Sequence, residues 1–405
     1  MPLLLRQGPR RQRPPRRRPL TPSVRIAVVG AGVGGLVAAT GLQRDGHDVT
    51  VYERRDAPGA VGAGLTLFGN AFDALDTVGL GGTVRAVSDD RITRMRTGQR
   101  SPSGRWLTTV PPRAVATART VHRNDLHDAL VSALRPGSLV AGTEAHPSPD
   151  GSPVLALAAR EAAYDLVVVA DGIRSAGRAR LGLDTGLRYA GYAAWRGVTE
   201  EPVDLAGAAG ETWGRGRRFG IVPLGDGRVY WFATHDEPEG TRAPDERARA
   251  RALFAGWHHP VGQCIDATPH TRVLRHDVHD LRRPLRAFVR DRTVLLGDAA
   301  HAMTPDLGQG AGQAIEDAAT LVVVLRDATG PDDLESGLAR YDAHRRRRTR
   351  ALAARSRAAG RVGQISNPLL AGSRDVALRT VAPTLLVRAS RTFRSWTPPS
   401  SGRNT

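Results

Sequence analysis

Runs of apolar residues, separated by glycine-rich or polar turns, predict alternating strands and helices in the first part of the chain. Ile26–Val29 is unbroken in its apolar character, which is typical of a buried strand, and His47–Glu53 is a second strand. Between them a glycine-rich turn leads into a helix expected over Gly34–Asp45. This unit is βαβ, so its crossover should be right-handed. Tyr164–Ala170 and Thr293–Leu296 are two further buried strands of the same kind.

The pattern changes between residues 187 and 280. Stretches of alternating character that carry aromatic residues, such as Arg217–Val222 and Arg228–Thr234, lie on either side of the turn Gly225-Asp226-Gly227. Two such stretches joined by a short glycine-containing turn indicate a β-hairpin. We therefore expect a separate, largely antiparallel sheet in this region.

Helical spacing governs most of the remaining chain. Asn124–Leu134 places its leucines on one face, and the pattern is helical from Gly310 onward. A helix starting near Pro331 carries the run Arg345–Arg348, which we expect to form a solvated face. We expect the tail after Phe393 to be disordered.

Composition limits the class of protein. A chain of 405 residues with 40% hydrophobic residues can fold into two or three domains with their own cores. The single cysteine, Cys264, excludes an intrachain disulfide and a cysteine-based metal cluster. No apolar run is long enough to span a bilayer.

The net charge is +18, and all 58 basic residues are arginine. Residues 1–23 contain many of these arginines and no acid, and no apolar segment follows them as in a secretory signal. We interpret residues 1–23 as a disordered basic leader and expect a cytoplasmic protein. Charge alone would also allow nonspecific nucleic-acid binding, although we expect no specific nucleic-acid partner.

A dinucleotide-binding pattern follows the first strand. Gly30, Gly32 and Gly35 satisfy G-x-G-x-x-G, a spacing that lets a pyrophosphate approach the backbone at a helix N-terminus. Glu53 ends the second strand, where its carboxylate can accept hydrogen bonds from a ribose diol. The acid also disfavours a 2′-phosphate at this position. The pattern by itself leaves NAD and FAD open.

Three further segments distinguish these possibilities. They are Val121-His122-Arg123, then Ala170-Asp171-Gly172 with Ser175 and Arg178, and lastly Leu296–His301 followed by Pro305 and Gly308-Gln309-Gly310. Together with the glycine pattern they resemble the flavoprotein aromatic hydroxylases, the group A flavin monooxygenases with the para-hydroxybenzoate hydroxylase fold. The resemblance extends from about Val24 to Arg361.

This resemblance implies non-covalent FAD, with NADH or NADPH as a transient co-substrate. No second G-x-G-x-x-G is present for the nicotinamide, as in the family. A flavin C4a-hydroperoxide would then place one oxygen atom of O2 on a small aromatic or heteroaromatic ring. By position, Glu53 would bind the adenosine ribose, Arg123 and Asp171 the pyrophosphate region, and Asp298 the ribityl chain. The full cofactor-binding set that it implies is Gly30, Gly32, Gly34, Gly35, Glu53, Arg54, Thr66, Arg123, Asp171, Gly172, Gly297, Asp298, Pro305, Gly308, Gln309 and Gly310.

A closer similarity is to the bacterial FAD-dependent urate hydroxylases and salicylate hydroxylase-like enzymes. It rests on Tyr189-Ala190-Gly191-Tyr192, Gly216-Arg217-Arg218, the strand around Tyr230 and Thr304-Pro305-Asp306. It implies that Arg218, Tyr230 and Asp306 face the substrate as the catalytic set. Arg196 departs from this similarity, which has asparagine there, and the turn after Gly310 also differs. Arg218 could equally be a surface arginine of a strand.

Several alternatives remain open. Epoxidation of an alkene or a flavin dehydrogenase would use the same cofactor site, and an arginine-rich nucleic-acid-binding flavoprotein is the non-enzymatic alternative. His276–Asp280 has metal-ligand residue types, but an exposed edge of the sheet fits it better, and we predict no metal.

The expected fold is α/β: a Rossmann-like FAD-binding domain of the GR2 type, an inserted, mostly antiparallel substrate domain, and C-terminal helices. We divide the chain into the leader at 1–23, the FAD-binding domain at 24–186 and 281–330, the substrate-binding domain at 187–280, C-terminal helices at 331–393 and a disordered tail at 394–405.

Overall fold

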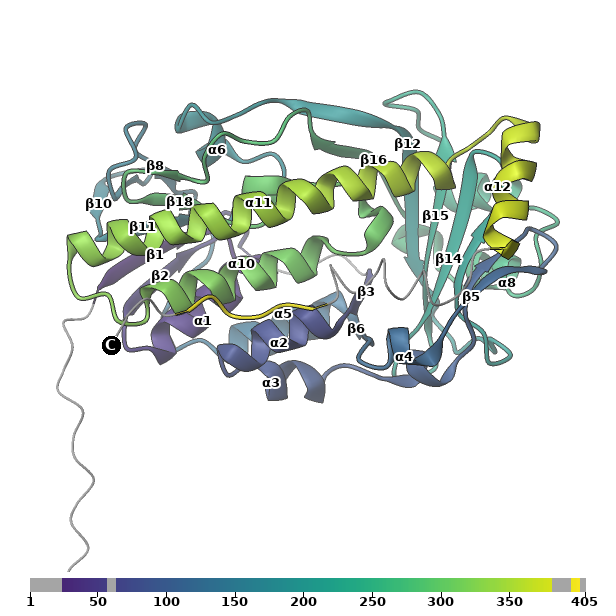
Figure 1. The fold of residues 1–405 in the computed structure, drawn as a ribbon, viewed down its shortest axis with the longest axis horizontal. Helices are drawn as coiled ribbons and strands as arrows, with labels where there is room; N and C mark the ends of the chain where they lie inside the picture. Colours follow the sequence, from purple (N-terminus) through teal and green to yellow (C-terminus); the bar gives the residue numbers. More distant parts are fainter. Residues whose placement is uncertain (1–23, 57–62, 381–394, 401–405) are drawn as a thin grey trace, which may run out of the picture.

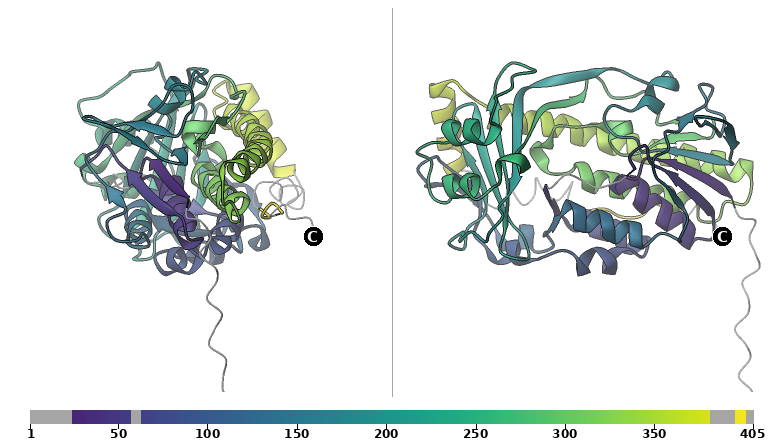
Figure 2. Two further views of the ribbon diagram at one scale, coloured as in Figure 1. Left: turned by 90° about the vertical axis from the view of Figure 1, so that its left-hand side faces the viewer. Right: turned by 180° about the vertical axis from the view of Figure 1, so that it is seen from behind.

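The computed structural model describes residues 24–56, 63–380 and 395–400. The leader at 1–23 therefore lies outside the described residues. A mostly parallel sheet occupies one end of the molecule and a larger sheet the other, and the long helix α11 (Pro331–Gly363) runs past both (Figures 1 and 2). The mixed α/β fold class predicted from the sequence is confirmed.

The first sheet is built from strands far apart in the sequence. Its order is β17 (Val289–Arg290), β18 (Thr293–Leu295), β11 (Leu166–Val169), β1 (Arg25–Val29), β2 (Asp48–Tyr52) and β7 (Leu139–Val140). All neighbours are parallel except β17 and β18. Every residue of β11 is buried, as expected for the unbroken apolar run of a central parallel strand.

Helices surround this sheet and share its core. They are α1 (Val33–Arg44), α2 (Gly69–Thr77), α3 (Gly81–Ala86), α5 (Arg123–Ser132), α6 (Ala176–Arg180), α9 (Asp298–His301) and α10 (Gly310–Leu325). Helix α10 packs against α1, α2 and α11. The predicted leucine face of α5 is confirmed, because Leu126 and Leu130 have no exposed surface.

The second sheet has seven strands. Their order is β16 (Leu274–Leu281), β12 (Leu187–Val198), β15 (Val229–Asp236), β14 (Arg217–Pro223), β13 (Gly210–Trp213), β4 (Thr97–Arg100) and β5 (Trp106–Val110). The predicted hairpin is formed by β14 and β15. The sheet is antiparallel except where β13 pairs with β4, and it includes two strands from before residue 187.

Alternation gives the two faces of this sheet different partners. Trp195, Phe219 and Trp231 point to one face, where they form a core with α7 (Glu246–Leu253) and α8 (Val261–Asp266). The register places Arg218, Tyr230, Thr234 and Arg196 on the opposite face. This second face is directed toward the first sheet.

Smaller elements complete the fold. They are β3 (Gly64–Leu67) paired with β6 (Arg119–His122), the three strands β8 (His146–Pro147), β9 (Val154–Ala156) and β10 (Glu161–Ala163), the helices α4 (Pro112–Val115) and α12 (Pro368–Thr380), and 3-10 turns at Arg91–Arg94, His270–Arg272 and Pro305–Leu307. Among the described helices, none has the length and apolar character needed to cross a bilayer.

One surface expectation from the sequence is wrong, and a second is only partly confirmed. Arg345 is 1% exposed and Arg348 contacts the buried Glu316, so the Arg345–Arg348 run is not simply a solvated face. The segment His276–Asp280 does lie on an edge strand, but Asp280 is fully buried and paired with Arg188 and Arg357. In both places charge of opposite sign from a distant part of the chain neutralises the buried group.

The expected disorder after Phe393 is also wrong where the structure describes that tail. Trp396 is 9% exposed within the core of the first sheet, and the carbonyl of Ser395 accepts a hydrogen bond from Arg348. The indole offers apolar area that is stabilised by burial. The rest of the predicted tail lies outside the described residues.

Candidate flavin and substrate site

A cavity of about 360 Å³ lies at the carboxyl ends of β1, β2 and β11. This edge is where open α/β sheets bind nucleotides. The cavity also reaches Arg196 and His276 on the second sheet. Its lining includes seven of the predicted cofactor residues: Gly30, Gly32, Glu53, Arg54, Arg123, Asp171 and Gly172.

The glycine turn between β1 and α1 is shaped by close backbone contacts. Gly30 has φ +106°, and a Cβ there would lie 2.5 Å from the carbonyl oxygen of Ala170. A Cβ at Gly35 would lie 2.1 Å from the oxygen of Gly30, and one at Gly34 would meet Leu296. At Gly32, by contrast, no atom of the described residues lies within 4 Å of a Cβ. The turn is therefore tight on its protein side and open where a phosphate would approach the N-terminus of α1.

Glu53 follows β2 and holds this turn. Its Oε2 accepts the N–H of Ala31 at 3.0 Å, and its Oε1 accepts the N–H of Arg55 at 3.0 Å. The side chain is half-buried and lines the cavity, so lone pairs remain available for a ribose diol. Its exposed neighbour Arg54 lies at the same rim.

Asp171 and Gly172 form the opposite wall. Asp171 Oδ2 accepts the N–H of Gly177 at 3.0 Å, near the start of α6. Its Oδ1 is buried and has no hydrogen-bond partner among the described residues. Gly172 has φ +86°, and within the described part of the chain nothing lies within 4 Å of a Cβ there. An orphaned carboxylate oxygen beside an open backbone position fits a ligand that supplies hydroxyl or amide donors.

Arg123 and Asp298 bring opposite charges toward the same space. Burial lowers the pKa of Arg123 and Arg196 lowers it further, while Asp298 opposes both. Burial raises the pKa of Asp298, whereas His301 and Arg123 lower it. Both residues are exposed although protein surrounds them, and Arg123 lines the 360 Å³ cavity. The turn residue before Asp298 is Gly297, with φ +63°.

The start of α10 and the turn before it contain four further predicted cofactor residues. Pro305 lies in a 3-10 turn, Gly308 has φ +63°, and Gly310 begins the helix with nothing within 4 Å of a Cβ. Gln309 is 1% exposed and its Oε1 accepts from Asn70 Nδ2 at 3.0 Å. The first N–H groups of this 16-residue helix form a positive dipole end.

Thr66 lies elsewhere, on β3 opposite Thr120, and does not line the 360 Å³ cavity. A Cβ at the neighbouring Gly64 would lie 2.5 Å from Tyr230. The β3–β6 ribbon therefore contacts the substrate-facing side of the second sheet.

The three predicted catalytic residues do not form one cluster. Arg218 and Asp306 are joined by an ion pair of 2.5 Å between Nη2 and Oδ1, and their side chains are 3% and 0% exposed. Tyr192 donates its hydroxyl to Asp306 Oδ2 at 2.9 Å. Tyr230 lies on the same sheet face, but it packs against Gly64 instead.

Arg218 is embedded in a wider set of contacts that sequence reasoning missed. Glu211 lies 3.7 Å away, and Gln364 Oε1 accepts from Arg218 Nε at 2.9 Å. Burial would lower the pKa of Arg218, but Glu211 and Asp306 raise it overall. The alternative of a surface arginine is therefore wrong. Gln364 follows α11, and nothing in its local sequence signals a contact to β14.

The described residues contain no group of three or more His, Cys, Asp or Glu side chains placed to hold a metal ion. Cys264 is buried, and burial raises the pKa of its thiol to about 12. A thiolate is thus disfavoured at neutral pH.

The comparisons with known proteins agree with this geometry. Residues 23–356 match the FAD binding domain family, and the chain belongs to it. It is 37% identical over 384 residues to an aurachin C monooxygenase/isomerase of Stigmatella aurantiaca, covering 92% of this chain and 98% of that protein. It is 33% identical over 347 residues to an FAD-dependent urate hydroxylase of Klebsiella pneumoniae, covering 82% and 89%.

The fold has a solved counterpart with cofactor and substrate. Klebsiella pneumoniae HpxO complexed with FAD and uric acid matches with a TM-score of 0.82 and 28% identity, over 91% of this chain and 96% of that chain. The predicted resemblance and the FAD cofactor are confirmed. The protein is an FAD-dependent oxidoreductase of the monooxygenase group.

Proposed function

We propose that this protein uses NAD(P)H, O2 and FAD to hydroxylate a small aromatic or heteroaromatic ring. One observation supports the ring-binding part of this proposal. On the face of the second sheet that is directed toward the first sheet, Arg218 forms an ion pair with Asp306 and lies beside the ring of Tyr192. Aromatic surface next to a buried charged cluster suits a planar, polar ring. When bound, FAD supplies the redox chemistry, taking electrons from the nicotinamide and passing them to O2.

The chain's own residues divide the binding work. We assign the ribose to Glu53, the pyrophosphate region to the Gly30–Gly35 turn and Arg123, and further donors of the cofactor to Asp171 Oδ1. Arg54, Thr66, Gly172, Gly297, Asp298, Pro305, Gly308, Gln309 and Gly310 complete the proposed set. The positive N-terminus of α10 would stabilise negative charge on a nearby ring.

The substrate side is arranged by Arg218, Asp306 and Tyr230. Because the Asp306 carboxylate has no exposed surface, its proposed task is to hold Arg218 and the Tyr192 hydroxyl in fixed orientations. Tyr230 would provide a separate aromatic wall near Arg123 and Arg196. Burial raises the pKa of the Tyr230 hydroxyl, and the charges of Arg196 and Arg123 oppose this effect.

We also propose a division into an FAD-binding part, built mainly from 24–186 and 281–330, and a substrate-binding part, built mainly from 187–280. The separate apolar cores of the two sheets support it, with β4 and β5 assigned to the substrate-binding part because they join the second sheet. A cytoplasmic location belongs to the same proposal, supported by the free, buried Cys264.

The test measures a panel of candidate ring compounds. It includes uric acid and aurachin C, which occur in the names of the relatives, and salicylate, which occurs in the resemblance found from the sequence. Flavin reduction by NADH and NADPH, hydrogen peroxide release and product formation are measured for each. A true substrate accelerates flavin reduction and suppresses peroxide while an oxygenated product appears. An epoxide product, or substrate oxidation without oxygen incorporation, would replace hydroxylation with one of the alternatives.

A further inference from the structure

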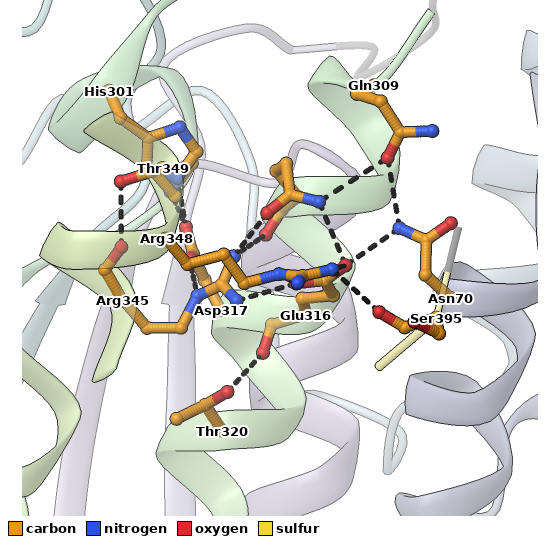
Figure 3. Close-up of polar contacts among 12 residues, drawn as sticks. Asn70, His301, Gln309, Glu316, Asp317, Thr320, Arg345, Arg348, Thr349 and Ser395 are labelled. Atoms are coloured by element: carbon orange, nitrogen blue, oxygen red, sulfur yellow. Dashed lines mark hydrogen bonds and ion pairs between the residues drawn. The ribbon is translucent and has the colours of Figure 1, made fainter. Parts of the chain in front are cut away.

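A network of polar side chains is buried between α10 and α11, behind the proposed flavin-binding segments (Figure 3). Glu316 and Asp317 are adjacent on α10 and have no exposed side-chain surface. Arg345 of α11 reaches both: its Nε donates to Asp317 Oδ1 at 2.5 Å, and its Nη1 donates to Glu316 Oε2 at 2.6 Å. Its Nη2 donates to Gln313 Oε1 at 2.8 Å.

One branch of the network ends on the Gly297–Asp298 turn. Asp317 Oδ2 accepts the backbone N–H of Gly297 at 2.8 Å and Nε2 of His301 at 2.5 Å. His301 Nδ1 is buried without a hydrogen-bond partner among the described residues, so we assign its proton to Nε2. The carboxylate thus fixes the left-handed turn from which Asp298 projects.

The other branch ends at the start of α10. Glu316 Oε1 accepts from Asn70 Nδ2 at 2.7 Å and from Gln313 Nε2 at 2.8 Å. Asn70 Nδ2 also donates to Gln309 Oε1 at 3.0 Å, and Gln309 is the N-cap residue of α10. Arg348 balances the second carboxylate through its contact with Glu316 Oε2 at 2.6 Å.

The arrangement has more than a packing function. Buried ion pairs stabilise a fold only weakly relative to apolar side chains, and their best-attested use is to fix one arrangement of the groups that they join. Here the two branches leave one guanidinium and end on two segments separated in sequence, both proposed to contact FAD. A network needed only to join α10 to α11 would have no reason to end there.

We propose that Arg345 is a positioning residue that couples the Gly297–Asp298 turn to the N-terminus of α10 and so sets both against the flavin. This inference rests on the proposed placement of those two segments. Asp317 and Glu316 transmit the position of Arg345, one to each segment. Substituting Arg345, Asp317 or Glu316 alters FAD binding and the yield of product per NAD(P)H without removing any group proposed to contact FAD.

The experiment compares Arg345→Lys, Asp317→Asn and Glu316→Gln in the full-length protein reconstituted with FAD. The matched control is Arg346→Gln, which removes an adjacent arginine of α11 whose partner is Asp342, at 2.9 Å, away from the network. The readouts are the FAD dissociation constant, the visible flavin spectrum, the reduction potential and the ratio of peroxide released to NAD(P)H oxidised. All are measured well below the unfolding temperature of each variant.

We expect the network variants to bind FAD about tenfold more weakly, with a shifted flavin spectrum and more peroxide, and the control to match the wild type. Loss of thermal stability with a wild-type FAD dissociation constant, spectrum and potential would overturn the proposal. If Arg345→Lys does not fold, the two carboxylate variants decide the question by the same readouts. Asp298→Ala tests the premise that the Gly297–Asp298 turn contacts FAD. If this variant has unchanged FAD affinity, the premise is refuted. If it binds FAD more weakly while the network variants match the wild type, only the positioning role of Arg345 is refuted.

Discussion

At the scale of single residues, the buried charge of Arg218 is stabilised by several partners at once. Its guanidinium forms ion pairs with Asp306 and Glu211 and donates a hydrogen bond to Gln364. The guanidinium carbon also lies 5.8 Å from the centre of the Tyr192 ring. Breaking a buried ion pair by removing one partner costs roughly 3–5 kcal/mol, because the remaining charge stays buried. Its substitution should therefore change both stability and the substrate site.

We predict that Arg218→Gln keeps FAD but uncouples the reaction, because the contacts of Arg218 with other described residues involve none that lines the 360 Å³ cavity. More of the NAD(P)H consumed in the presence of substrate should yield hydrogen peroxide, and coupled turnover should fall by roughly one to two orders of magnitude. Tyr230→Phe should uncouple with a smaller loss of stability. Peroxide and product are quantified against NAD(P)H. Wild-type coupling in both variants would remove these residues from the substrate site.

Asp236 gives a prediction about pH. Burial raises the pKa of its carboxyl to about 6, although the hydrogen bond from Gln364 Nε2 at 2.7 Å and the charge of Arg218 lower it. A pKa raised in the folded state means that stability is lost as pH rises through about 6. Asp236→Asn should thus raise the unfolding free energy at pH 7–8 by about 1 kcal/mol, after allowing for solvent screening.

The gain from Asp236→Asn should disappear below about pH 4, where the aspartate is protonated in both states. Chemical unfolding at several pH values measures it, and an equal gain at acid and neutral pH would show that ionisation is not the cause.

At the scale of elements, α11 is shaped to fit the substrate side. A Cβ at Gly360 would lie 2.5 Å from Asp306 Oδ2, and one at Gly363 would lie 2.9 Å from Arg218 Cδ. Glycine inside a helix is less stable than alanine by about 1 kcal/mol. We therefore infer that glycine is needed at these two positions because a larger residue would collide with Asp306 or Arg218.

We predict that Gly360→Ala lowers stability, reversing the gain that helix propensity alone would give. The Asp306 carboxylate cannot simply move aside, because Arg218 and Tyr192 both hold it. Gly372→Ala, at an exposed position inside α12, is the control, since no described residue lies within 4 Å of a Cβ there. Thermal unfolding and coupling efficiency are measured together. A stabilised, fully coupled Gly360→Ala protein would show that the contact has no importance.

Elements also show what the sequence could predict. The β1–turn–α1 unit and the β14–β15 hairpin follow from local patterns of apolar residues and glycines, and both were predicted. The burial of Arg345 was not, because its partners Glu316 and Asp317 lie on another helix. Local spacing shows which face of a helix is charged, but not whether acids from elsewhere cover that face. The same reason hides the contact of Gln364 with Arg218 and the joining of β4 and β5 to the second sheet.

At the scale of the whole molecule, the site is assembled from nearly the full described length of the chain. The proposed cofactor wall uses the ends of β1, β2 and β11, and the proposed substrate wall uses β12, β14 and β15. Helix α11 contacts Asp317 of α10 through Arg345 and lies against Arg218 of β14 at Gly363. In Figure 2 the same helix runs beside both sheets when the molecule is seen from behind. No single segment holds the site, so its parts are fixed by the packing of the two sheets.

The last prediction concerns the basic leader. All the residues to which we assign FAD follow Val24, and the match to the FAD binding domain family spans residues 23–356. A protein that begins at Val24 should therefore keep its FAD content, unfolding temperature and coupling. Removing 23 residues also removes seven arginines, so any nonspecific affinity for nucleic acid should fall, and both proteins should lose it as salt increases. Flavin absorbance, thermal unfolding and DNA binding at two salt concentrations test this. A shortened protein that loses FAD would show that the leader supports the fold, and nucleic-acid binding that persists in it would place the basic surface on the folded part.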